Sequence, residues 1–195
     1  PTIAAPDPAY HDLRFYETFG HYGFLMKTRA VTLRDTGAAL SPFNAFLLIQ
    51  GLETLSVRMD RHVQNALAVA KFLKAHPKVA WVAYAGLEDS PYHALAQKYT
   101  PRGPGAVFTF SLKSSNARLA GKQFIESLHV FSHLANIGDV RSLVIHPAST
   151  THQQLSEEEL IEAGIDAGMI RLSIGLETTE DLLWDLDQAL QQTSA

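Results

Sequence analysis

The chain has 195 residues, of which 46% are hydrophobic and 18% are charged, and its formal net charge is −4. This composition is typical of a globular protein with a sizeable core, and its mild acidity excludes the basic surface that nucleic acid or anionic lipid would need. No apolar run reaches the roughly 18 residues of a membrane-spanning helix. Because cysteine is absent, disulfides, thiolate catalysis and cysteine-bound metals are excluded, and we expect a reducing, cytoplasmic setting.

The N-terminal region opens on Pro-Thr-Ile-Ala-Ala-Pro-Asp-Pro, without an initiator methionine or the basic and apolar parts of a signal peptide. Closely spaced prolines are typical of irregular structure, so we expect a cut within a loop and a fragment of a longer protein. A helix is then predicted from about Tyr22 to Thr36. It should end at Gly37, which can adopt the left-handed conformation of a helix C-cap.

A second, long helix is predicted to start at Ser41-Pro42, where a hydroxyl cap precedes proline at the first helical position. Apolar residues then recur at intervals of three and four almost unbroken as far as His76-Pro77, which ends the pattern. Gly51 is a candidate bend. The composition changes near residues 40–50, and we expect a domain boundary there that this helix bridges.

After Pro77 the chain alternates between strand-like and helix-like segments. The expected strands cover residues 79–84, 106–112, 130–137, 142–146 and 169–176, and the expected helices cover residues 91–99, 116–128, 156–164 and 178–190. Asn116 and Ser156 are suitable helix caps, and Ser156 forms a capping box with Glu159. This alternation predicts an α/β (α+β) fold in which helices cover one face of a sheet.

Arg171 is the candidate binding residue that strand geometry isolates. Because side chains alternate across a strand, the isoleucine and leucine side chains of residues 169–174 share one face, and Arg171 and Ser173 share the other. A guanidinium in this place offers a planar fork of donors, which suits a carboxylate held by two parallel hydrogen bonds. The alternative interpretation is a solvated arginine or a structural ion pair.

The stretch from Asn136 to His152 combines an apolar strand core with many small polar side chains. Buried polar groups destabilise a fold unless each finds a partner, so this stretch forms either a tightly satisfied turn or the wall of a polar site. Asn136 could donate its amide to a ligand carboxylate or to a cofactor, although an ordinary Asx-Gly turn explains the same residues.

The remaining polar candidates do not define a reaction. His146 and His152 lack a third ligand at suitable spacing, whereas metal sites need three or four ligands, and a histidine satisfied at a strand end is the favoured interpretation. Ser41, Ser142 and Ser149 do not lie in a Gly-x-Ser-x-Gly elbow, so capping and turn roles are favoured over nucleophilic ones. We therefore expect no metal site.

Five sequence blocks carry a family resemblance. They are Ala39-Leu-Ser-Pro-Phe-Asn-Ala45, Gly51-Leu-Glu-Thr-Leu-Ser-Val-Arg-Met-Asp-Arg-His62, Asn136-Ile-Gly-Asp139, Ser142-Leu-Val-Ile-His-Pro-Ala-Ser-Thr-Thr-His152 and Ile170-Arg-Leu-Ser-Ile-Gly-Leu-Glu177. In this order they resemble the C-terminal portion of the pyridoxal-phosphate (PLP) enzymes of Cys/Met metabolism, over essentially the whole chain. Several separated blocks are far more specific than any single motif.

Three features resemble the O-acetylhomoserine sulfhydrylase branch of that family. Residues 6–20 are similar to an insertion found in sulfhydrylases. Asn136 stands where lyase-type relatives tend to carry serine, and Thr150-Thr151-His152 replaces their usual Ser-Met-Thr-His.

The resemblance implies a fold of the aspartate-aminotransferase type (fold type I). Residues 1–45 would be the end of the large PLP-binding domain, and residues 46–195 the small C-terminal domain, joined by the long helix. The enzymes are usually homotetramers built as dimers of dimers. Arg171 would bind the substrate α-carboxylate with Asn136 beside it, while Ser142 matches a family position without a definite role.

The chain departs from the family in what it lacks. The lysine that forms a Schiff base with PLP lies in a Ser/Thr-rich segment upstream of the Pro-Asp-Pro block, and no such segment is present. Lys27 does not fit that motif. We therefore expect no catalytic residue in this chain, with PLP bound mainly by a missing N-terminal part.

The implied reaction is γ-replacement on O-acetylhomoserine by sulfide or a thiol, giving homocysteine or methionine in methionine biosynthesis. A cystathionine γ-synthase or methionine γ-lyase relative is the alternative within the family. A stand-alone module without catalytic activity is the alternative outside it. The expected partners are the amino-acid substrate, the sulfur donor, the rest of the same enzyme and further copies of it, but neither nucleic acid nor membrane.

Overall fold

The structure, a computed structural model, describes residues 2–193. The chain divides into two compact units, Pro1–Glu53 and Thr54–Ala195. Among the helices between residues 2 and 193, none combines the length and the apolar character that crossing a bilayer requires.

The first unit is built from short helices joined by turns and loops. Short 3₁₀ turns at Pro8–Tyr10 and Gly20–Tyr22 flank α1 (Phe15–Phe19), and a continuous helical path follows through α2 (Gly23–Lys27), a π-helical stretch (Thr28–Leu33) and α3 (Arg34–Thr36). The path ends at Gly37, whose φ of 63° is left-handed, so the predicted helix and its C-cap are confirmed. The unit ends with α4 (Pro42–Glu53), where the Ser41 hydroxyl accepts the Asn44 N–H at 3.1 Å as a helix cap.

The long helix that the sequence predicts is interrupted at Thr54. This residue has φ −105° and ψ 5° and separates α4 from α5 (Leu55–Ala75), whereas Gly51 lies inside α4. The Thr54 hydroxyl accepts the Arg58 Nε–H at 3.3 Å, a local bond of the kind that lets threonine compete with regular helix. The division into compact units falls at the same place.

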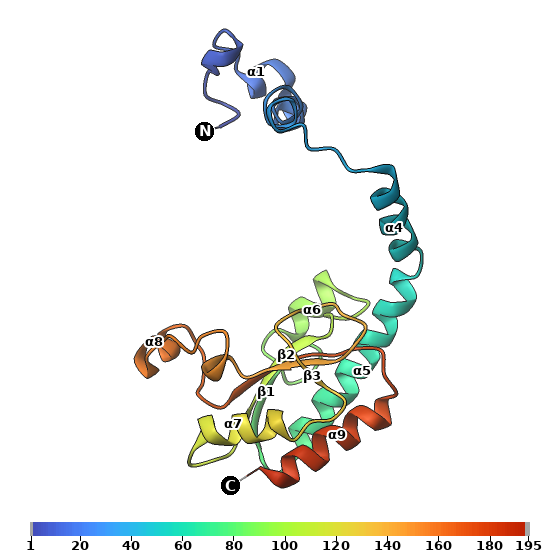
Figure 1. The fold of residues 1–195 in the computed structure, drawn as a ribbon, viewed down its shortest axis with the longest axis vertical. Helices are drawn as coiled ribbons and strands as arrows, with labels where there is room; N and C mark the ends of the chain where they lie inside the picture. Colours follow the sequence, from blue (N-terminus) through green and yellow to red (C-terminus); the bar gives the residue numbers. More distant parts are fainter. Residues whose placement is uncertain (1, 194–195) are drawn as a thin grey trace. The chain divides into compact units, whose positions relative to one another are not determined.

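The second unit contains a five-stranded sheet (Figure 1). Its strands are β1 (Val79–Ala83), β2 (Val107–Leu112), β3 (Ser132–His133), β4 (Leu143–Ile145) and β5 (Met169–Ser173), in the order β1-β2-β5-β4-β3. All neighbours are antiparallel except β3 and β4, which are parallel. The five predicted strands are confirmed, although β3 is much shorter than expected. The middle position of β5 places Arg171 between two neighbouring strands.

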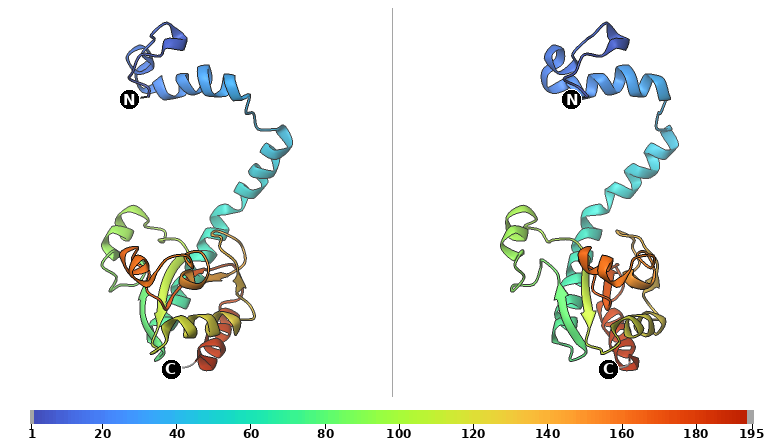
Figure 2. Two further views of the ribbon diagram at one scale, coloured as in Figure 1. Left: turned by 60° about the vertical axis from the view of Figure 1, so that its left-hand side comes forward. Right: turned by 90° about the vertical axis from the view of Figure 1, so that its left-hand side faces the viewer.

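Helices α5, α7 (Ala117–Glu126) and α9 (Thr179–Gln192) cover one face of the sheet (Figures 1 and 2). Their apolar side chains form a single core with the sheet, which includes Val69, Leu73, Phe108, Phe110, Phe124, Ile170, Leu172, Leu182 and Leu186. The α/β prediction and the alternation predicted for β5 are thereby confirmed. The two short helices, α6 (His93–Tyr99) and α8 (Glu157–Glu162), lie outside this core, and α8 starts at the predicted capping box.

Candidate functional site

Arg171 lies on the face of the sheet opposite the helical core. It sits at the middle of β5, with Thr109 of β2 on one side and Ile145 of β4 on the other. Its side chain is partly exposed, while Ile170 and Leu172 on either side of it are fully buried. Among the side chains that the structure describes, no carboxylate forms an ion pair with it. The guanidinium is therefore held on rigid structure without an internal anion to neutralise it.

Asn136 lies next to Arg171, but the contact is made by the backbone of Asn136 and not by its side chain. The Arg171 Nη2 donates to the Asn136 carbonyl at 3.3 Å, and the Asn136 N–H donates to the Leu134 carbonyl at 3.1 Å in a tight turn. The Asn136 side chain is exposed, and its amide has no hydrogen bond to any other described residue. An exposed amide beside a cation can bind an anionic ligand jointly with it.

Ser142 is fully buried and has its hydrogen bonds inside the fold. Its hydroxyl donates to Glu177 Oε2 at 2.8 Å and accepts the Gly175 N–H at 2.8 Å, while its own N–H donates to Glu177 Oε1 at 2.6 Å. Ser142 therefore ties the segment before β4 to the segment after β5. Sequence reasoning included Glu177 in a family block but gave it no role.

Polar residues of α5 hold the end of β5 in place. His62 Nδ1 lies 2.6 Å from the Ile174 carbonyl, and Asn65 Nδ2 donates to the carbonyls of Gly175 at 3.0 Å and Glu177 at 2.9 Å. Both α5 side chains are buried. They interrupt an otherwise apolar helix face, and that interruption is the signal from which the sequence could have indicated this anchoring role.

His146 is satisfied at the end of β4, as predicted. Its Nδ1 lies 2.8 Å from the Ser149 hydroxyl, and its Nε2 lies 2.8 Å from the Ala167 carbonyl. Burial lowers the pKa of His146 below its ordinary value, because the charged ring would lose its solvation. No three histidine, aspartate or glutamate side chains in the described part of the chain gather where they could bind a metal ion.

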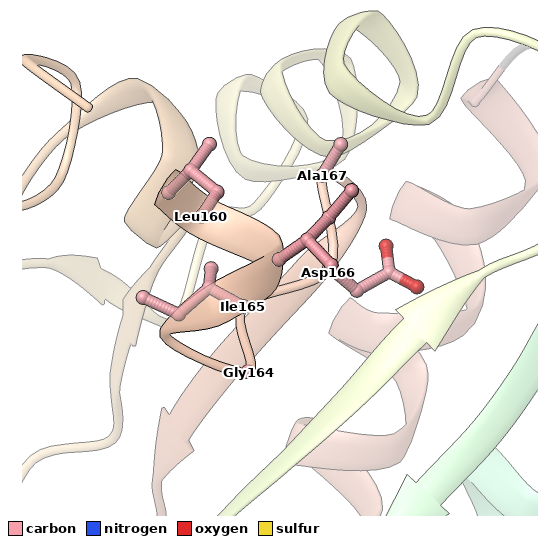
Figure 3. A pocket seen from close by; sticks show the side chains of 6 residues that line it. Leu160, Gly164, Ile165, Asp166 and Ala167 are labelled. Atoms are coloured by element: carbon pink, nitrogen blue, oxygen red, sulfur yellow. The ribbon is translucent and has the colours of Figure 1, made fainter. Parts of the chain in front are cut away.

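A hollow of about 470 Å³ lies beside α8 (Figure 3). It is lined by Leu160, Ile161, Gly164, Ile165, Asp166 and Ala167. Its one charged group, the Asp166 carboxylate, already accepts the Ser111 hydroxyl at 3.2 Å and the Gly168 N–H at 2.6 Å. Neither Arg171 nor Asn136 lines this hollow, so it is separate from the candidate site.

None of the seven lysines lies buried in a cavity. Lys27 pairs with the Asp7 carboxylate at 3.0 Å and donates to the Thr2 carbonyl at 2.7 Å. Lys78 donates to three carbonyls at the end of α9, and the other five lysines are exposed. The described residues thus offer a candidate anion site at Arg171 but no shielded amine for covalent chemistry.

Solved structures establish the class of protein to which this fold belongs. A Campylobacter jejuni protein described as an O-acetylhomoserine (thiol)-lyase, solved with a pyridoxyl-lysine monophosphate, has a TM-score of 0.83 and 45% identity over 97% of this chain and 44% of its own. Cystathionine gamma synthase from Xanthomonas oryzae, solved with cystathionine, has a TM-score of 0.71 and 42% identity over 81% of this chain and 40% of its own. The fold is that of PLP-dependent enzymes.

The family follows from the sequence match. The model of the Cys/Met metabolism PLP-dependent enzyme family matches residues 18–191, so the chain belongs to this family, as the resemblance predicted. It is 52% identical to O-acetyl-L-homoserine sulfhydrylase 1 of Thermus thermophilus over 97% of this chain and 45% of the relative. It is 48% identical to homocysteine synthase of Schizosaccharomyces pombe over 98% of this chain and 44% of the relative. The chain therefore spans less than half the length of these curated relatives.

Proposed function

We propose that this chain is the C-terminal part of a PLP-dependent O-acetylhomoserine sulfhydrylase, which makes homocysteine or methionine from O-acetylhomoserine and sulfide or a thiol by γ-replacement. The high identity to O-acetyl-L-homoserine sulfhydrylases supports the reaction class. The observation that supports the role of this chain is the position of Arg171: its guanidinium lies on the face of the sheet opposite the helices and donates a hydrogen bond to the carbonyl of Asn136.

In this proposal Arg171 binds the substrate α-carboxylate. Its planar fork can form two parallel, charge-assisted hydrogen bonds, which fix the direction of the carboxylate as well as its distance. The Asn136 amide adds a donor beside it. Because the carboxylate is held at two points, the α-carbon and its proton are oriented for the reacting groups.

The described residues do not fit the cofactor itself, because no shielded lysine lies among them. We propose that the additional length found in the relatives contains the lysine and binds PLP. The cofactor supplies the electron sink for such reactions, and the residues of this chain supply binding and orientation. We further propose a cytoplasmic homotetramer built as a dimer of dimers, which is the assembly that the family resemblance implies.

Product analysis of the full-length protein tests the reaction. The protein is incubated with O-acetylhomoserine and either sulfide or cysteine, and the products are identified by mass spectrometry. We expect homocysteine from sulfide, with little cystathionine from cysteine. Cystathionine as the main product would instead support the second candidate, a cystathionine γ-synthase, which the 42% identity to the Xanthomonas oryzae enzyme favours.

The size of the natural gene product tests the fragment interpretation. A gene product of about twice the 21.4 kDa mass of this chain would support the interpretation that this chain is the C-terminal part of a larger enzyme. A product of 21.4 kDa without either activity would support the non-catalytic module instead.

A further inference from the structure

The loop of residues 134–142 connects β3 to β4 and carries Asn136. Its apolar side chains do not anchor it, because Leu134, Ile137 and Val140 are 47%, 59% and 49% exposed. The position of the loop must therefore be set by hydrogen bonds rather than by packing in the core.

The bonds near Asn136 are long. The Arg171 guanidinium meets the Asn136 carbonyl at 3.3 Å, and the Gly138 N–H meets the Ser173 hydroxyl at 3.4 Å. Both lie beyond the common range for N–H donors to oxygen. These contacts alone would hold the amide of Asn136 only loosely in front of Arg171.

The strong bonds lie at the other end of the loop. Ser142 and Glu177 form two bonds of 2.6 and 2.8 Å, the Ser142 hydroxyl also accepts the Gly175 N–H at 2.8 Å, and the Leu176 N–H donates to the Val140 carbonyl at 2.8 Å. Two of them go to the Glu177 carboxylate, and hydrogen bonds to carboxylates are among the stronger kind. The loop is thus fixed to the end of β5 at this point.

Gly175 makes the close approach possible. A Cβ at this position would lie 2.4 Å from Glu177 Oε2, 2.4 Å from the Val140 carbonyl oxygen and 2.5 Å from the Ser142 nitrogen. The backbone of Glu177 is itself held by α5, because its carbonyl accepts from Asn65 at 2.9 Å and from Arg61 at 3.1 Å. The side chain of Glu177 therefore links the rigid core to the loop.

We propose that Ser142, Gly175 and Glu177 form a clasp that positions the Asn136 amide beside Arg171, and that this clasp sets the affinity of the site for the α-carboxylate. The inference rests on the proposed function of Arg171. The three clasp residues act through Asn136 and Arg171 and do not touch the substrate, so they are positioning residues. The clasp makes the carboxylate-binding geometry depend on the end of β5.

The test uses the full-length enzyme with PLP and two ligands that differ only in the carboxylate, L-norleucine and n-pentylamine. The dissociation constant of each is measured from the absorption of the bound cofactor. We expect Ser142→Ala to weaken norleucine about 10-fold, the effect of losing roughly one hydrogen bond to a charged group. Pentylamine binding should change less than about twofold. Glu177→Gln keeps the shape of the side chain and should weaken norleucine selectively by about threefold or more.

Ser111→Ala is the matched control. Ser111 is also a buried serine, 2% exposed, whose hydroxyl donates to a carboxylate, that of Asp166. Its side-chain hydrogen bond goes to Asp166, outside the loop of residues 134–142. We expect this variant to lower the thermal midpoint and to leave the ratio of the two dissociation constants unchanged.

Two results separate the failure of the clasp from the failure of the proposed function. If Arg171→Ala weakens norleucine alone, while both clasp variants change the two ligands equally or not at all, the clasp is wrong and the carboxylate site stands. If Arg171→Ala also leaves the ratio unchanged, the assignment of Arg171 is wrong and the clasp falls with it. If Ser142→Ala does not fold, Glu177→Gln decides by the same criterion.

Discussion

At the residue scale, the position of Arg171 defines what this chain can contribute to an enzyme. The side chain stands on the central strand β5, partly exposed, and the apolar side chains next to it in sequence are locked in the core. Because the strand already holds this side chain in place, the side chain loses little conformational entropy when a ligand binds to it. We therefore expect the proposed reaction to depend strongly on this one side chain.

Replacement of Arg171 should therefore reduce substrate recognition. In the full-length protein we expect Arg171→Ala to lower kcat/KM for O-acetylhomoserine by about 100-fold, the ~3 kcal/mol of a lost charge-assisted bidentate pair. Arg171→Lys should recover only part of this, because an ammonium lacks the planar fork. Arg102→Ala, which removes an exposed arginine outside the loop of residues 134–142, is the control. Steady-state kinetics measure the effect, and unchanged constants for Arg171→Ala would refute the assignment.

His146 should make the second unit sensitive to mild acid. The folded-state pKa of His146 lies below its ordinary value because the side chain is buried. Below about pH 6.5, His146 therefore binds a proton more readily in the unfolded chain than in the folded chain. Stability should be complete above that pH and fall as the pH decreases towards the folded pKa, by up to about 1.4 kcal/mol per pH unit. His76, whose pKa is also lowered by burial, adds to the slope.

The 195-residue chain offers a direct measurement of that slope. Its two tryptophans, Trp81 and Trp184, both belong to the second unit, so urea unfolding followed by tryptophan fluorescence reports on that unit. His146→Gln removes the titrating group and should flatten the dependence of unfolding free energy on pH between 5 and 7, whatever its effect on absolute stability. An equally steep dependence in the variant would show that His146 does not contribute.

At the scale of secondary-structure elements, periodicity and caps predicted most of the fold. Apolar alternation located β5, and Asn116 caps α7 by accepting the Leu119 N–H at 3.2 Å. The break at Thr54 was missed because the apolar pattern continues across it. For the site, strand alternation identified Arg171, and the polar stretch from Asn136 to His152, together with the family resemblance, indicated Asn136. The role of Glu177 depends on segments 35 residues apart, and no local pattern encodes such a contact.

The C-terminal end of α9 shows how one side chain can stabilise an element. The Lys78 ammonium donates to the carbonyls of Leu190 at 2.9 Å, Gln191 at 3.1 Å and Thr193 at 2.8 Å. Carbonyl groups at a helix C-terminus lack hydrogen-bond partners within the helix and carry the negative end of its dipole. A cation there provides hydrogen bonds to these carbonyls and also interacts favourably with the dipole.

We expect Lys78→Met to lower the unfolding free energy of the second unit by about 1–2 kcal/mol, because three charge-assisted bonds are lost while the aliphatic stem remains. Urea unfolding of the 195-residue chain measures the change. Lys122→Met, which removes an exposed lysine paired with Glu126 at 3.8 Å, should change stability by less than about 0.5 kcal/mol. Equal effects of the two variants would contradict the capping role.

At the scale of the whole molecule, the two units differ in how completely they bury their apolar residues. The second unit has a closed core of sheet and helices. In the first unit, α4 carries apolar side chains around its whole circumference, and each of the following is more than half exposed: Phe43, Phe46, Leu47, Leu48, Ile49 and Leu52. A helix that is apolar on all sides is stable only when other structure surrounds it.

The second unit should therefore fold without the first. We expect residues 54–195, expressed alone, to unfold cooperatively with the same urea midpoint as in the 195-residue chain, since their core includes no residue of the first unit. The 195-residue chain should bind the dye ANS more strongly and self-associate more, because it exposes α4. In the full-length enzyme, where we expect further structure to cover α4, Leu48→Lys should reduce the yield of folded protein. A lower urea midpoint for residues 54–195 would show that the first unit contributes to the stability of the core. Equal dye binding by the two chains would show that α4 is already covered.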